Sequence, residues 1–218
     1  MTTVATLITK ARRRLNQTSE TFHTAADMLA YCGEAQDYIV TETNCLEEIS
    51  TSSVVGDQQA YALPSDYQDM DRLLYEEQRL LRVDRTQIDE LDIDETAHSG
   101  EPEVYYIYNS QYWLFPVPSA TTDGDELKLY YYKKPALLTA TTDSLEIDTR
   151  FDGSVVAYMA YMGFLKEKEF DMADYHLAEA NAKIKSVMIK LNEKTDGHYR
   201  MKLGRTNKFR NPLQNWWN

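Results

Sequence analysis

The acidic segment between residues 92 and 103 is the first place where residue types and spacing could support chemistry. Four oxygen-bearing side chains match positions 1, 3, 5 and 12 of a calcium-binding loop: Asp92, Asp94, Thr96 and Glu103. That loop needs glycine at position 6, where this chain has Ala97, and it needs a following helix. Pro102 and the aromatic run after it favour a strand instead. We therefore interpret the segment as a solvated acidic loop.

Catalytic and metal-binding motifs of the common kinds do not occur in the sequence. The four histidines do not have the spacing of a zinc-binding pair: His23, His98, His176 and His198. The eight glycines form no nucleophile elbow, Walker loop or dinucleotide-binding pattern. Carboxylates are so numerous between residues 57 and 103 that a pair facing one cleft would arise by chance. We therefore expect a protein that is not an enzyme and that has no cofactor and no metal.

The distribution of aromatic residues is more informative. The chain has 16 tyrosines, and aromatic residues crowd two segments: Tyr105, Tyr106, Tyr108, Tyr112, Trp113, Phe115, Tyr130, Tyr131 and Tyr132. Neighbours in a strand point to opposite faces, so both faces of these strands carry aromatic side chains. One face must be core, and the other is either an exposed interface or is covered by helices or loops of the same chain. The interface candidates are Tyr105, Tyr108, Tyr112 and Trp113.

Charge is unevenly distributed along the chain. The net charge is −12, but residues 197–218 contain five basic residues and no acid, so the other 196 residues carry −17. An acidic body of this kind should repel nucleic acid. The C-terminal segment combines its basic residues with aromatic ones: Tyr199, Arg200, Lys202, Arg205, Lys208, Phe209, Arg210, Trp216 and Trp217. Such a segment is either a solvated tail or an arm that becomes ordered on a partner, with Trp and Arg as anchors.

Composition places the chain among globular proteins, with 43% hydrophobic and 27% charged residues. No apolar run is long enough for a transmembrane helix, and residues 1–9 do not resemble a secretory signal. We expect both cysteines, Cys32 and Cys45, to lie in one helix, too far apart to form a disulfide. A reducing compartment is therefore the simpler expectation.

Helical periodicity occurs at both ends of the chain. Apolar residues of the first segment follow one helical stripe: Val4, Leu7, Ile8, Ala11 and Leu15. Thr24 and Asp27 form the pattern of a capping box, and we expect the helix that they begin to continue to about Glu48. Helical period returns near Asp148 and is interrupted near Glu169, which predicts a helical hairpin or a kinked long helix.

The central region has the period of strands. We expect short strands at residues 51–55, 70–75, 78–83, 104–108, 112–115 and 127–132. Turns are expected at Gly56-Asp57, Glu76-Glu77 and Asn109-Ser110, with a short helix after Asp84. The predicted fold class is α+β. A helical bundle is built from residues 1–50 and 148–196, an antiparallel β-sandwich or barrel is inserted at 51–147, and residues 197–218 form an extended arm.

This order of elements resembles a known family. The segments that carry the resemblance are Thr51-Ser52-Ser53, Tyr61-Ala62-Leu63-Pro64-Ser65-Asp66, Gly100-Glu101-Pro102-Glu103-Val104-Tyr105, Trp113-Leu114-Phe115-Pro116-Val117-Pro118, Leu127-Lys128-Leu129-Tyr130-Tyr131-Tyr132 and Lys134-Pro135. Together with the flanking helices, they resemble the head-to-tail adaptor (connector) proteins of tailed bacteriophages, of the tail tubular protein A type. The similarity extends over nearly all of residues 1–191, and the double tryptophan at the end is not part of it.

The resemblance implies a structural virion protein at the head–tail junction, made in the host cytoplasm. It implies a homo-oligomeric ring, usually of twelve copies, between the portal protein and the next tail, nozzle or stopper protein. DNA would pass through the lumen without specific binding, and no membrane would be involved. The arm residues named above would then reach the portal. Acidic residues that could line the channel are Glu76, Glu77, Asp92, Asp94 and Glu95.

Two alternatives remain open from the sequence. The first is another component of the tail junction, a stopper or a tail terminator, which would form a sixfold ring. The second is a carbohydrate-binding or hydrolytic β-module that uses the tyrosine-rich face. Ring size would identify the first, and glycan binding or hydrolysis would identify the second.

Overall fold

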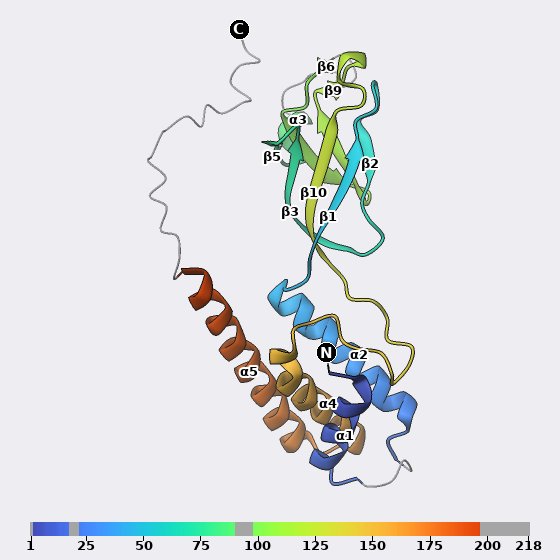
Figure 1. Cartoon of the computed structure of the whole chain (residues 1–218), viewed down its shortest axis with the longest axis vertical. Coiled ribbons are helices and arrows are strands. Elements are labelled where there is room, and N and C mark those ends of the chain that lie inside the picture. The colour runs from blue at the N-terminus through green and yellow to red at the C-terminus, as the bar shows by residue number, and fades with distance from the viewer. Residues whose placement is uncertain (1, 18–21, 90–97, 197–218) are drawn as a thin grey trace. The chain divides into compact units, whose positions relative to one another are not determined.

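The computed structural model describes residues 2–17, 22–89 and 98–196. In it the described residues form two compact units, each of which is treated by itself. One is helical and contains residues 2–46 and 133–196 (blue and yellow to red in Figure 1), and the other is a β-unit of residues 47–132 (cyan to yellow-green). The fold class is α+β, as the sequence predicted.

The described residues of the helical unit form four α-helices: α1 (Val4–Arg14), α2 (Ala25–Thr43), α4 (Asp152–Glu167) and α5 (Phe170–Asp196). Helix α4 packs against α1, α2 and α5, so it lies at the centre of the unit. The predicted stripe of α1 is confirmed, because its five apolar residues are all buried in the core of this unit. Gly163 of α4 allows the close approach of α1, since a Cβ there would lie 2.6 Å from a methyl carbon of Leu15.

Helix α2 begins at the predicted capping box but ends earlier than predicted. Thr24 accepts a hydrogen bond from the Asp27 backbone, and the Asp27 carboxylate accepts one from the Thr24 backbone. Asn44 takes a left-handed conformation, and its N–H bonds to the Val40 carbonyl at 2.8 Å, which ends the helix. The extension to Glu48 is therefore wrong, and only Cys32 lies in α2. Both cysteines are free thiols in the structure, but the shared helix on which that expectation was based does not exist.

The break near Glu169 separates two helices, which makes this region a helical hairpin and not a kinked helix. Lys168 adopts a left-handed conformation at the end of α4, and its N–H bonds to the Leu165 carbonyl at 3.1 Å. Helix α5 then packs along α4. His176 of α5 is buried and stacks on the ring of Phe164, with ring centres 5.3 Å apart.

Glu179 connects three basic side chains across the helical unit. Its carboxylate lies 2.6 Å from Arg14, 2.6 Å from Lys183 and 3.1 Å from Nδ1 of His176. Burial opposes ionisation, but these hydrogen bonds outweigh it and lower the pKa of Glu179 from 4.5 to about 2. Its contribution to stability is therefore complete above the unfolded pKa and is lost as the pH falls through about 2.

Replacing Glu179 with glutamine is expected to lower the free energy of unfolding by about 1–2 kcal/mol at neutral pH, because the carboxylate is partly solvated. The difference between variant and wild type should shrink as the pH is lowered from 4.5 towards 2. Urea unfolding followed by circular dichroism at several pH values measures this. Asp174, an exposed acid of the same helix, provides the control, since Asp174→Asn should leave stability nearly unchanged. If Glu179→Gln lowered the free energy of unfolding by the same amount at every pH, the ionic explanation would be wrong.

The β-unit is built mainly from two four-stranded sheets. The first sheet has the order β1 (Glu47–Ser53), β10 (Glu126–Lys133), β3 (Tyr67–Tyr75) and β4 (Gln78–Arg79). The second has the order β2 (Ala60–Ala62), β8 (Gln111–Phe115), β7 (Val104–Tyr108) and β5 (Leu81–Arg82). Side chains of both sheets form one core, among them Leu73, Leu114 and Leu127, so the arrangement is a sandwich.

Two short strand pairs are parallel, which the expectation of a purely antiparallel domain missed. β5 pairs with β7 in parallel, and β6 (Ser99–Gly100) pairs in parallel with β9 (Val117–Pro118). Helix α3 (Arg85–Asp89) follows β5, and the Asp84 carboxylate accepts a hydrogen bond from the Thr86 backbone, as its expected capping role requires.

The boundaries between the units differ from those inferred from the sequence. Glu47 to Ser50 belong to β1 and pair with β10, so the β-unit begins earlier than residue 51. Residues 133–147 belong to the helical unit, where Leu145 and Ile147 are buried in its core. The Gln36 side chain also accepts a hydrogen bond from the Glu146 backbone at 3.0 Å.

Candidate interaction surfaces

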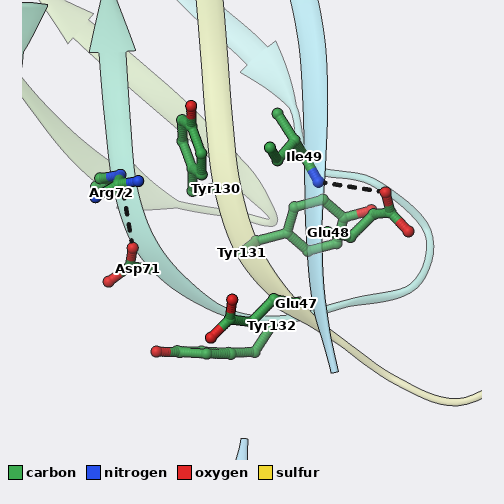
Figure 2. Close-up of a pocket in the computed structure, with 8 residues that line it drawn as sticks. All are labelled: Glu47, Glu48, Ile49, Asp71, Arg72, Tyr130, Tyr131 and Tyr132. Atoms are coloured by element: carbon green, nitrogen blue, oxygen red, sulfur yellow. Dashed lines mark hydrogen bonds and ion pairs between the residues drawn. The ribbon is translucent and has the colours of Figure 1, made fainter. Parts of the chain in front are cut away.

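The outer face of the first sheet carries a hollow of about 390 Å³ lined by residues of β1, β3 and β10. Figure 2 shows the lining residues: Glu47, Glu48, Ile49, Asp71, Arg72, Tyr130, Tyr131 and Tyr132. The strand register brings them together, because Ile49 lies opposite Tyr130 and Glu47 lies opposite Tyr132. Leu129 and Tyr131 point into the sandwich core, so Tyr130 and Tyr132 point out of it.

Arg72 occupies this hollow because the alternation of β3 changes there. Asp71 and Arg72 are both exposed between buried Met70 and Leu73, which is the pattern of a β-bulge. The Arg72 guanidinium lies 4.2 Å from the centre of the Tyr130 ring, and its Nε lies 3.7 Å from the Asp71 carboxylate. Figure 2 shows the guanidinium beside the Tyr130 ring.

The hollow offers apolar, aromatic and acidic groups side by side. Ile49 is 53% exposed and lines the hollow, to which it adds an apolar group. Burial, followed by the carboxylates of Asp71 and Glu47, raises the pKa of the Tyr132 hydroxyl above its ordinary value. Aromatic faces beside carboxylates suit basic and apolar side chains of another polypeptide.

The predicted interface residues of the β7–β8 hairpin are not all on the surface. Tyr105 and Tyr112 are each only 3% exposed and belong to the sandwich core, so the expectation for these two is wrong. The register decides this, since Tyr105 lies opposite Leu114 on the inward face and Tyr112 stacks on Tyr61. Tyr108 is half exposed beside the Arg85 guanidinium.

The second aromatic face of this hairpin is largely covered within the chain. Ile88 of α3 and Val83 pack against Tyr106 and Phe115 in a separate small core. Trp113 packs against that core, stacked on Tyr106 with ring centres 5.9 Å apart. The sequence left two interpretations open for this face, an exposed interface or coverage by the same chain. For most of the face, coverage by the same chain is correct.

Two of the predicted channel acids, Glu76 and Glu77, form the tight turn between β3 and β4. Both residues have positive φ values, 43° and 66°, as a two-residue hairpin turn requires. Glu76 accepts a hydrogen bond from the Glu126 backbone at 2.6 Å, and Glu77 forms an ion pair with Lys128. The remaining three acids, Asp92, Asp94 and Glu95, lie outside the described residues, as does the first half of the calcium-like segment.

The residues of the predicted arm, from Tyr199 to Trp217, also lie outside the described residues. Within the described ranges, no group of three or more potential ligands lies close enough to hold a metal ion. In the same ranges no helix has the length and apolar character needed to cross a membrane.

Sequence reasoning did not find the hollow of Figure 2, because it placed Glu47 and Glu48 at the end of a helix. Tyr130 and Tyr132 were recognised as part of an aromatic group, but their neighbour Ile49 was not. The usable signal was Ile49-Ser50-Thr51, where two β-branched residues alternate with serine.

The fold and these surfaces describe a protein of two units whose exposed features are suited to contacts with other polypeptides. A family model for SU10 adaptor proteins matches residues 2–206, nearly the whole chain. The chain therefore belongs to the SU10 adaptor protein family, and it is a phage adaptor-type structural protein of the virion. A search of curated proteins for similar sequences found no match.

Proposed function

We propose that this protein is the head-to-tail connector of a tailed phage, of the tail tubular protein A type, and that it forms a ring beneath the portal. The observation that carries the proposal is the family match over residues 2–206. The architecture supports it, since a helical unit made from both chain ends holds an inserted β-sandwich. Twelve copies would surround the channel and join the capsid to the next tail protein, with DNA passing through the lumen.

Copy number in the particle tests this proposal. Electron microscopy of virions, with the protein located by an N-terminal tag, should place a twelvefold ring directly below the portal. A sixfold ring farther from the portal would support the stopper or tail terminator instead. If the virions contained the protein only as monomers or dimers, every ring-forming function would be contradicted.

We propose that acidic residues of the β-unit, with Glu76 and Glu77 first, face the channel or its rim. Negative charge there would repel phosphate and let DNA slide without adhering. The variant Glu76→Lys/Glu77→Lys is expected to slow DNA ejection, and more so at low salt, because phosphate attraction is screened by ions.

The control variant is Glu76→Gln/Glu77→Gln, which removes the Glu77–Lys128 ion pair and the charges of the turn without adding positive charge, and leaves the pair between Lys128 and Glu126. Ejection kinetics of phage carrying each variant should show the lysine variant as the slower one. Equal rates of DNA ejection for both variants and the wild type would show that these two residues do not face the channel.

A further inference from the structure

Strand β1 is an open edge of the first sheet. It lies at the end of the order β1-β10-β3-β4, so within the described chain it has a strand neighbour on one side only. Six of its seven residues are exposed, and the remaining one, Ser50, is half-buried. The strand contains no lysine and no proline, the residues that commonly protect such edges from pairing with another chain.

The backbone groups on its free side can be assigned from the ladder. Val54 donates to the Asp125 carbonyl at 2.8 Å, and Lys133 donates to the Leu46 carbonyl at 3.0 Å, which sets the phase of the β1–β10 pairing. Antiparallel pairs alternate, so Glu47, Ile49, Thr51 and Ser53 direct their N–H and C=O groups away from β10. The Ile49 N–H bonds at 3.4 Å to the carboxylate of its own neighbour, Glu48.

The side chains of this edge indicate the chemistry of an added strand. Glu47 and Glu48 are consecutive, so one carboxylate lies on each face of the sheet. Ile49 and the hollow beside Tyr130 add an apolar and aromatic surface on the outer face. The best complement is an extended segment that carries basic residues on one face and apolar residues on the other.

The chain itself contains such a segment. Residues 198–203 alternate strictly between polar and apolar types, His198, Tyr199, Arg200, Met201, Lys202 and Leu203, within the acid-free C-terminal region. We propose that β1 of one copy accepts residues 198–203 of a second copy as an additional strand. This inference rests on the proposed ring, because donor and acceptor are different parts of the chain and their pairing repeats from copy to copy until the ring closes.

Binding of a synthetic peptide of residues 197–206 to the full-length protein tests the surface. Thr51→Pro removes one outward N–H, whereas Thr51→Ala removes only the side chain. Fluorescence anisotropy should give the same affinity for wild type and Thr51→Ala, and at least about tenfold weaker binding for Thr51→Pro. A control peptide has the same composition in shuffled order. Its affinity for the wild type should be no higher than the affinity of the native peptide for the Thr51→Pro variant. Equal binding of the shuffled peptide, or by the proline variant, overturns the proposal.

Cross-linking identifies which copy supplies the segment. Two differently tagged full-length chains, both with the half-buried thiol of Cys45 removed by Cys45→Ser, one with Thr51→Cys and one with Met201→Cys, are mixed, assembled on portal rings and oxidised. A disulfide joining the two tags is expected, and Ser52→Cys, whose backbone faces β10, is the control for the acceptor position. Rings that form without this cross-link overturn the inference but leave the proposed function standing. The same holds if a single chain that carries both substitutions forms the disulfide only within itself. Failure of the wild type to form rings contradicts the proposed function itself.

Discussion

Deleting residues 198–218 is expected to abolish docking of the protein onto purified portal rings while both units remain folded. This stretch contains the five basic residues of an acid-free region and the terminal pair Trp216-Trp217. Cations can guide the arm to an acidic partner, and two large aromatic side chains can anchor it in a pocket. Docking is measured by co-sedimentation with portal rings, and folding by the circular dichroism of the truncated protein.

A second variant separates anchoring by the tryptophans from every other role of the arm. Trp216→Ala/Trp217→Ala keeps all five cations and the alternating segment 198–203, and it should weaken docking by about tenfold or more, as loss of an aromatic anchor commonly does. Truncated protein that docks as well as the full chain would reduce the arm to a solvated tail. Attachment to the portal would then have to come from the helical unit.

Replacing Tyr112 with alanine is expected to lower the free energy of unfolding of the β-unit by about 3 kcal/mol, because removing the ring would leave a cavity between the two sheets. Tyr112 is 3% exposed, stacks on Tyr61 at 5.4 Å and lies near the Ser52 hydroxyl on the inward face of β1. Chemical unfolding followed by tyrosine and tryptophan fluorescence measures the loss.

Tyr108 is the matched control, because it belongs to the same hairpin but is 50% exposed. Tyr108→Ala should cost little stability and should instead lower the recruitment of the next tail protein if this hairpin contacts it, as we propose for Tyr108 and Trp113. A folded Tyr108→Ala/Trp113→Ala variant that recruits tails at the wild-type level would show that the two residues only support the small core around Ile88.

Features that depend on nearby residues could be predicted from the sequence. The stripe of α1, the capping box at Thr24 and the break after Glu167 are set by contacts within a few residues. The same holds for the turns at Glu76-Glu77 and Asn109-Ser110, where all four residues have positive φ. The α+β class follows from the order of these local signals.

Features that depend on pairing between distant segments required the tertiary structure. Residues 44–48 continue an acceptable helical composition, and only the pairing of β1 with β10, about eighty residues away in sequence, shows that Glu47 begins a strand. Likewise, composition marked Tyr105, Tyr108, Tyr112 and Trp113 as one group. The register of β7 with β8 puts Tyr105 and Tyr112 in the sandwich core and Tyr108 and Trp113 on the opposite face, where Tyr108 is half exposed and Trp113 packs against the small core.

The sequence by itself therefore determined the local elements, the fold class and the uneven distribution of charge. Tertiary structure decided which faces of the strands are covered and which edge stays open. The physical reason is that consecutive strand residues alternate between faces, so a shift of one residue in register exchanges core and surface. That choice depends on a partner strand far away in the chain, and it placed Ile49, Arg72 and Tyr130 together around the hollow of the first sheet.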